Sequence, residues 1–272
     1  MEETQRGAGW LEAPWDDPKL KDKIRNGDFA SPTVKRWRED MEIIGKALSS
    51  DLQLHRQVYE ELGHIIAANP RLREGNVFME CLFRWYVAHA LVAIRREIDA
   101  TKRTISLVRL LEEIKRNRAE LTRRKHRLLH SGSEDVPPPP NDIFVTTLLD
   151  RGYDEFADAT GDALDAGKIQ ADIDALKAAT ARLETYTNET ITHRNRERAT
   201  HPERFANEDP LHMKDVHDAI DVVEAIVKRY IALLTGAGYS TLNPVMQYDW
   251  TEIFTFAWRT RLPTNDDRRL RG

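Results

Sequence analysis

The spacing of apolar residues along this chain predicts helices over most of its length. One long helix should begin at Ser31, which can cap the first turn, with Pro32 at a position that proline favours. Its apolar residues recur every three or four positions, as an amphipathic helix requires, until Asn69 and Pro70 end it. The sequence has no internal repeat and no series of alternating strands, so we predict an all-α fold, a multi-helix bundle.

A second helix, over about residues 76–101, is apolar almost all round through its first turns. Such a helix is typical of the centre of a bundle. Glu80, Arg84 and His89 interrupt the apolar run, whereas a membrane span should be longer and nearly free of charge. We therefore predict a buried core helix, with His89 as a core histidine whose hydrogen bonds are satisfied, and no membrane as partner.

Charge and proline mark the middle of the chain. Ser106 should cap a third helix, whose continuation over residues 115–127 is strongly basic. Four prolines cannot continue a helix, so residues 131–141 should form a long surface loop, with a docking site as the alternative. We interpret the acidic stretch at residues 150–165 as a solvated face near the basic helix, because no compact metal-ligand spacing occurs in it.

Two further helices and an aromatic tail complete the chain. Residues 168–186 and 213–235 each carry one apolar stripe. The chain thus divides into an irregular, aromatic N-terminal arm at residues 1–30, a helical bundle at 31–236 and a C-terminal tail at 237–272. We expect the tail to pack on the bundle, as an irregular cover or a short strand.

Composition agrees with a globular protein. Of the 272 residues, 40% are hydrophobic and 32% charged, too apolar a balance for a disordered chain. The net charge of −4 does not favour a general polyanion binder, although it leaves room for local basic faces. Cys81 is the single cysteine, expected to be a small buried core residue. A reducing, cytoplasmic setting is expected, and the N-terminus lacks the pattern of a signal peptide.

Most common catalytic motifs are missing from the sequence. It has no P-loop, no glycine-rich dinucleotide fingerprint, no Gly-x-Ser-x-Gly elbow and no zinc signature. We therefore expect no metal and no cofactor. A polar cluster remains at the end of the helix that reaches Tyr186, and it consists of Asn188, His193, Arg194, Asn195, Arg196, Arg198 and His201.

The groups in this cluster are those that cleave RNA without a metal. A histidine, with an ordinary pKa of about 6.5, can move the proton of the 2′-hydroxyl or of the leaving oxygen. An arginine binds phosphate oxygens through its planar fork and stabilises a phosphorane-like transition state. Composition alone does not establish catalysis, because a surface loop rich in Arg, Glu and His is usually just solvated.

Four stretches of the chain, taken in order, resemble the abortive-infection, AbiU-like branch of the HEPN superfamily. They are residues 93–114, 187–195, 215–236 and 242–254. The resemblance implies a bundle of HEPN type, and a homodimer that builds a composite site. It also implies a metal-independent endoribonuclease acting on RNA, as a toxin of phage defence or of a toxin–antitoxin type system. An antitoxin or a defence-system protein would be a further partner.

The resemblance assigns His193 to the site but leaves the arginine of the family motif unmatched. Four to six residues separate that arginine from the histidine, and this chain has Thr187 where the spacer would be five and Asn188 where it would be four. The charge could come from Arg194, or from Arg95 or Arg96 held by Asp99 one turn away, although a structural ion pair at that helix end is an equal reading. A shifted motif would use Arg194 or Arg196 with His201. The expected catalytic residues are His193, Asn188, Arg194, Arg96 and Asp99, and the expected RNA-binding residues are Arg95, Arg196, Arg198 and His201.

Three functions follow from these observations. The first is an endoribonuclease of a bacterial defence system, which needs His193 for turnover. The second is a catalytically silent HEPN module that binds RNA, a nucleotide or a partner protein. The third is a plain interaction protein whose basic residues 115–127 meet nucleic acid through phosphates alone, so that its binding would fall steeply with salt.

Overall fold

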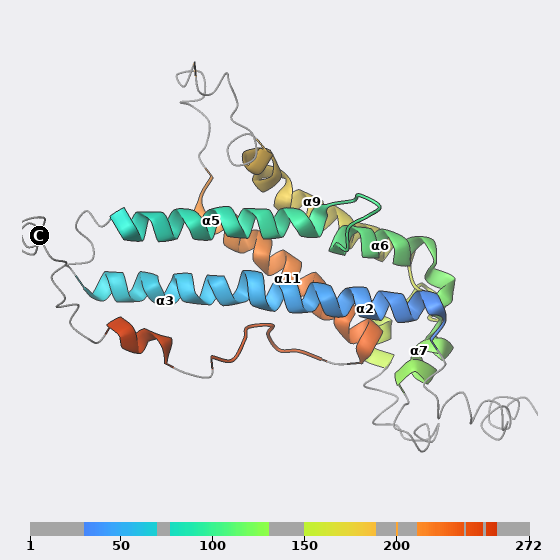
Figure 1. The fold of residues 1–272 in the computed structure, drawn as a ribbon. Helices are drawn as coiled ribbons and strands as arrows, with labels where there is room; N and C mark the ends of the chain where they lie inside the picture. Colours follow the sequence, from blue (N-terminus) through green and yellow to red (C-terminus); the bar gives the residue numbers. More distant parts are fainter. Residues whose placement is uncertain are drawn as a thin grey trace, which may run out of the picture.

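In the computed structural model of the chain, helices make up most of the residues that the structure describes (Figure 1). The structure describes residues 30–69, 77–130, 150–188, 200, 211–236, 238–246 and 249–254. Across these residues the pairing of extended backbone is limited to one isolated antiparallel bridge, between Ala157 and Leu164. The predicted all-α fold is therefore confirmed. The surface loop expected at residues 131–141 and nearly all of the expected N-terminal arm fall outside the described residues.

The first helix of the described residues is a long rod in three parts. It consists of α2 (Pro32–Ala47), the π-helical segment η1 (Leu48–Gln53) and α3 (Leu54–Ala68). The hydroxyl of Ser31 accepts a hydrogen bond from the backbone N–H of Val34 at 3.3 Å, and Pro32 occupies the first turn, as predicted. The π-helical segment was not predicted. In this segment the backbone hydrogen bonds join residues five positions apart, as between the N–H of Leu54 and the carbonyl oxygen of Ser49. Such short π-helical segments are often found at functional positions.

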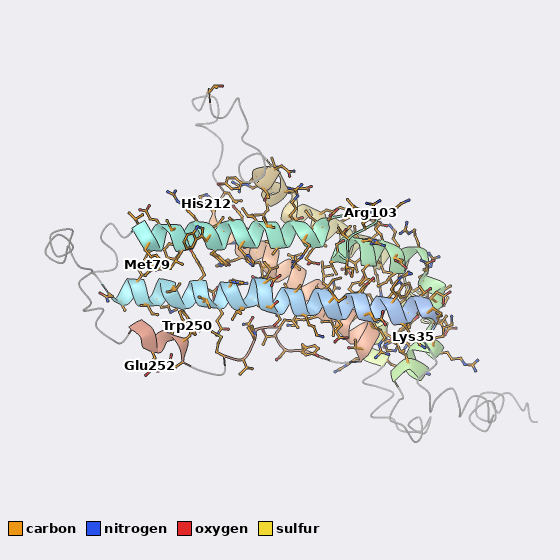
Figure 2. All side chains as sticks on the ribbon, viewed as in Figure 1. Lys35, Met79, Arg103, His212, Trp250 and Glu252 are labelled. Atoms are coloured by element: carbon orange, nitrogen blue, oxygen red, sulfur yellow. The ribbon has the colours of Figure 1, made fainter. Side chains whose placement is uncertain are left out.

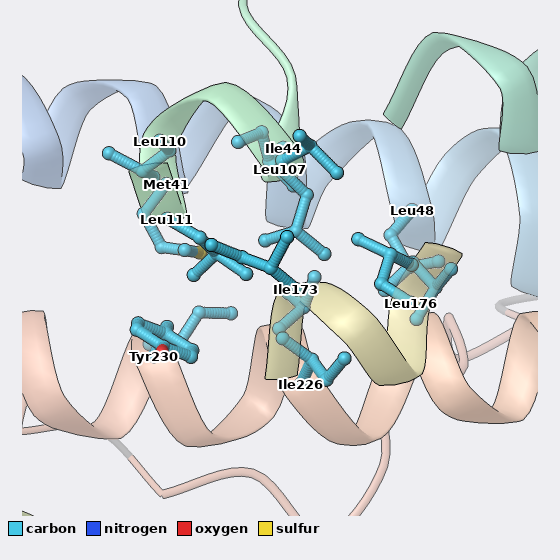
Figure 3. Packing of buried hydrophobic residues seen from close by; sticks show 14 of the residues in the cluster. Met41, Ile44, Leu48, Leu107, Leu110, Leu111, Ile173, Leu176, Ile226 and Tyr230 are labelled. Atoms are coloured by element: carbon cyan, nitrogen blue, oxygen red, sulfur yellow. The ribbon is translucent and has the colours of Figure 1, made fainter. Parts of the chain in front are cut away.

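Four elements pack around the rod to form the core. They are α5 (Val77–Ile98), α6 (Leu107–Arg116), α9 (Ala166–Tyr186) and α11 (Met213–Thr235). Figure 1 shows α5 running alongside the rod while α11 crosses behind both. Side chains from the rod, α6, α9 and α11 meet in the close view of Figure 3, among them Met41, Leu111, Ile173 and Tyr230, which are almost fully buried. Each such side chain contributes about 1.5–3 kcal/mol by leaving water.

Helix α5 is only partly a core helix, which corrects the prediction for its first half. About a third of its most apolar stretch is buried, mainly around Leu91 and Ile94. Phe78 and Trp85 are exposed by 54% and 61% of their surface. An all-round apolar pattern cannot indicate which side of a helix faces its neighbours, and that is why the first half was misplaced. By length and composition alone, α5 is the one helix in the described residues that could cross a membrane.

Two single residues of α5 also differ from expectation. Cys81 is half-buried rather than buried. His89 is exposed, and one of its ring nitrogens lies 3.1 Å from the backbone carbonyl oxygen of Asp51.

The acidic stretch lies beside the basic helix, as predicted, and it folds back on that helix, which the sequence had left open. Helix α7 (Arg123–His130) follows a short 3₁₀ turn, η2 (Arg118–Glu120). Arg127 of α7 binds both carboxylate oxygens of Asp150, with N–O distances of 2.8 and 2.6 Å. This bidentate bond from Arg127 holds the pKa of Asp150 below its usual range. Part of the basic surface is thus neutralised within the chain.

The end of the chain covers the rod. Gly236, with φ of +70°, closes α11 in the left-handed conformation that suits glycine. The backbone N–H of Leu242 donates to Glu224 at 3.0 Å, and the indole N–H of Trp250, in the 3₁₀ helix η5 (Trp250–Phe254), donates to Glu61 of α3 at 2.7 Å. Figure 2 shows Trp250 beside the far end of α3. In its described residues the tail is irregular apart from η5, and it forms no strand.

Candidate functional site at the π-helical turn

The π-helical segment brings two histidines to one backbone carbonyl. Nδ1 of His55 and Nε2 of His89 lie 2.7 and 3.1 Å from the carbonyl oxygen of Asp51. Their ring centroids are 4.3 Å apart. Because a carbonyl oxygen only accepts hydrogen bonds, both of these nitrogens must carry hydrogen. In the neutral rings, Nε2 of His55 and Nδ1 of His89 are then the nitrogens that can accept a proton.

The side chain of the same aspartate holds an arginine. Nη2 of Arg96 lies 2.9 Å from Oδ2 of Asp51, and this hydrogen bond lowers the pKa of Asp51 from its ordinary value. The guanidinium side chain of Arg96 is 46% exposed, so it can meet a further anion. One residue of the π-helical segment, Asp51, thus fixes two histidines through its backbone and an arginine through its carboxylate.

A buried carboxylate lies under this arginine. Glu97 is 3% exposed, and burial raises its pKa to about 7 against the opposing effect of Arg96. Nε of Arg96 lies 3.5 Å from its Oε1, and its Oε2 accepts the backbone N–H of Leu107 at 3.3 Å. Glu97 therefore joins the site to the start of α6.

The expected partner of Arg96 was wrong. The carboxylate of Asp99 accepts hydrogen bonds from the backbone N–H and the hydroxyl of Thr101, at 2.9 and 3.2 Å, in the turn after α5. Arg96 is instead held by Asp51, which lies 45 positions away in the sequence. Arg95, its neighbour on α5, is half-buried.

An aromatic groove between α3 and α5 opens beside the two histidines. It encloses about 300 Å³. Tyr59 stacks on Tyr86 with ring centroids 4.4 Å apart and meets Phe83 edge-on at 5.2 Å. The described residues that line the groove include no Asp, Glu, Lys or Arg, and they are His55, Val58, Tyr59, Leu62, Leu82, Phe83, Trp85, Tyr86 and His89.

The start of the predicted motif lies at the end of α9. Thr187, at one position of the missing arginine, is 1% exposed, and its hydroxyl donates to the carbonyl oxygen of Leu183 at 2.7 Å. Asn188, at the other position, is half-buried. The other predicted site residues of this segment lie outside the described residues, and they are His193, Arg194, Arg196, Arg198 and His201.

Sequence reasoning missed Asp51 and His55 and placed His89 in the core. One signal was available: Asp51 and His55 are four positions apart, and His89 and Arg96 are seven apart, so each pair shares a helix face. Only the tertiary structure shows that these two helix faces meet. Within the described part of the chain, no group of three or more His, Cys, Asp and Glu side chains is arranged to hold a metal.

Comparison with known proteins gives one match. The family model HEPN_AbiU2, described as AbiU2, matches residues 46–256. The match spans well over half of the 272 residues, and it includes both the π-helical turn and the segment of His193. Neither a curated protein nor a solved structure matches the chain.

Proposed function

Since the chain belongs to the AbiU2 family of HEPN proteins, an abortive-infection family, we propose that it is a metal-independent endoribonuclease of bacterial defence. The observation that carries the proposal is the placement of Arg96. This arginine is fixed by Asp51, remains nearly half exposed and shares its anchoring residue with two histidines. It supplies the kind of charge that the buried Thr187 cannot supply.

The proposed reaction is attack of a ribose 2′-oxygen on the adjacent phosphorus. A histidine, His193 in our assignment, takes the 2′-hydroxyl proton, and the P–O5′ bond breaks as the new P–O2′ bond forms. The leaving 5′-oxygen takes up a proton, so the products are a 2′,3′-cyclic phosphate and a 5′-hydroxyl. Arg96 stabilises the charge that develops on the phosphate oxygens, and Asn188 and Arg194 orient the phosphate.

The proposal includes the partners that the resemblance implies. We infer a homodimer with a composite site, a cytoplasmic setting, and an antitoxin or another defence protein that controls the activity. Arg95, Arg196, Arg198 and His201 would bind RNA outside the reacting phosphate, and Asp99 would order the turn that follows α5.

Cleavage of a mixed cellular RNA pool in EDTA tests the proposal. The purified full chain should cut RNA, and His193→Ala and Arg96→Ala should each lower the rate by about a hundred-fold or more. Arg84→Ala is the matched control, since Arg84 is an exposed arginine on the same helix and should retain the wild-type rate. A folded wild type that leaves RNA intact, or a His193→Ala variant that still cuts at the wild-type rate, contradicts the proposal.

A second candidate is the catalytically silent module. The observation that favours it is the burial of Thr187, because the position of the motif arginine then presents no charge to RNA. In the same assay this candidate predicts that RNA is bound but not cut. The plain interaction protein loses support, because Arg123 and Arg127 of its basic stretch pair with Asp154 and Asp150 of the same chain.

A further inference from the structure

The groove between α3 and α5 has walls unlike those of an ordinary surface depression. Its flat aromatic faces come from Tyr59, Phe83, Trp85 and Tyr86. Its described lining contains no Asp, Glu, Lys or Arg side chain. Trp85 stands at its edge with 61% of its surface exposed, although burial of a tryptophan is strongly favourable. An exposed tryptophan beside a stacked pair of tyrosines offers faces on which a flat ring can lie.

One end of the groove differs from the rest, because it carries groups that bind an anion. His55 and His89 belong to the groove lining, and both contact the carbonyl oxygen of Asp51. Arg96 is bound to the carboxylate of that same residue and is half exposed. The aromatic faces therefore lead to two imidazoles, which Asp51 links to the guanidinium of Arg96 outside the groove lining.

We propose that this groove binds single-stranded RNA, with a base stacked on the aromatic wall beside Trp85 and its phosphate at His55, His89 and Arg96. The inference rests on the proposed function in taking RNA as the ligand. A flat ring followed by an anion is the repeating unit of a nucleic-acid strand, and aromatic faces stack any of the four bases. A duplex hides its base faces, so the groove should prefer unpaired segments.

The groove is lined by described residues of α3 and α5, and His193 is not one of them. The groove would set which part of an RNA is presented, namely an unpaired one. It would not choose a base sequence, because stacking is tolerant of sequence.

Binding of an RNA that cannot be cut tests the inference apart from the catalysis. The probe is a fluorescently labelled, 2′-O-methylated single-stranded oligonucleotide, measured by anisotropy in EDTA against the matching duplex. The wild type should bind the single strand more tightly than the duplex. Trp85→Ala should weaken binding by about five-fold or more, and Trp85→Phe, which keeps an aromatic face, should restore most of it. The double variant His55→Ala/His89→Ala should also weaken binding.

The matched control is Phe78→Ala, because Phe78 is an exposed aromatic residue of the same helix outside the groove. Wild-type affinity in the Trp85 and double-histidine variants, or equal binding of single strand and duplex, overturns the inference. So does a loss of self-association in Trp85→Ala, measured by sedimentation, with RNA affinity unchanged, since the groove would then hold a second copy of the chain. If RNA binds through the groove but the wild type does not cleave it, the proposed nuclease is wrong and the RNA-binding groove is supported. If the wild type cleaves RNA and Trp85→Ala binds RNA as tightly as the wild type, the RNA-binding groove is wrong and the proposed nuclease is supported.

Discussion

Two clusters of arginine and carboxylate side chains lie in different parts of this bundle and are built differently. In the α7 cluster, Arg127 binds both oxygens of Asp150, and Arg123 pairs with Asp154 and stands over the ring of Tyr153. In the π-turn cluster, a single arginine, Arg96, is shared by two carboxylates.

The difference lies in which groups are left available. Every arginine in either cluster pairs with a carboxylate of the same chain, so the ion pairs themselves do not separate the two clusters. The π-turn cluster adds two histidines, each of which contacts the carbonyl oxygen of Asp51 through one ring nitrogen only. The other ring nitrogens, Nε2 of His55 and Nδ1 of His89, are not used in these contacts. We infer that the first cluster stabilises the fold and that the second is arranged for a ligand.

The largest expected effect on stability comes from Glu97, the buried carboxylate of the π-turn cluster. Its folded-state pKa of about 7 lies above the ordinary value of 4.5 for a glutamate side chain. The unfolded chain therefore releases this proton first, and the contribution of Glu97 to stability, complete below about pH 4.5, is lost as the pH rises towards 7. Glu97→Gln should remove this decline, which amounts to roughly 1–3 kcal/mol between pH 4.5 and 8.

Urea unfolding at several pH values measures this effect. The slope of unfolding free energy against pH should be less negative in Glu97→Gln than in the wild type. Glu80→Gln is the control, because Glu80 is exposed on the same helix. Identical slopes for the wild type and Glu97→Gln would show that Glu97 does not hold its proton into the neutral range.

A comparable effect is expected at the centre of the α7 cluster. The hydroxyl of Tyr153 is shared between the carbonyl oxygens of Leu121 and Asp162, each 3.0 Å away, and the side chain is fully buried. Tyr153→Phe should lower the free energy of unfolding by about 1–2 kcal/mol, because the two carbonyls lose this donor. Cleavage of RNA per folded molecule should not change. Tyr239→Phe, at an exposed tyrosine, is the control, and loss of cleavage in a folded Tyr153→Phe would break the division of roles between the clusters.

The sequence predicted the parts of this structure that depend on neighbours in the chain. The start of α2 at Pro32 follows from a capping serine and a proline, and the end of α11 follows from Gly236. Opposite charges on either side of one loop indicated that the acidic stretch lies near the basic helix, although they did not show whether it pairs with that helix or with a partner. These signals are local, or nearly so.

The π-turn cluster could not be predicted in the same way. A π-helical segment such as Leu48–Gln53 differs from the helix around it only in hydrogen-bond register, which tertiary packing decides. Asp51 meets His89 and Arg96 across 38 and 45 positions of sequence. Of the catalytic residues proposed from the sequence, Arg96 takes part in this cluster, Asp99 belongs to the turn after α5, and the role of His193 stays a prediction.

The smallest effect is expected from opening the α7 cluster at its surface. Arg127 is 48% exposed on its side chain, so water and salt screen its bidentate bond to Asp150. Arg127→Ala should therefore cost at most about 1 kcal/mol of unfolding free energy, and less at high salt. Arg124→Ala, at an exposed arginine of the same helix, should cost less still. Urea unfolding at low and high salt measures both.

The comparison of Arg127→Ala with Arg96→Ala in RNA cleavage is the sharper test, because one arginine is removed from each cluster. If the clusters differ as we infer, the α7 variant keeps full RNA cleavage while the π-turn variant loses it, and a loss of cleavage in both would show that the α7 cluster also serves the RNA.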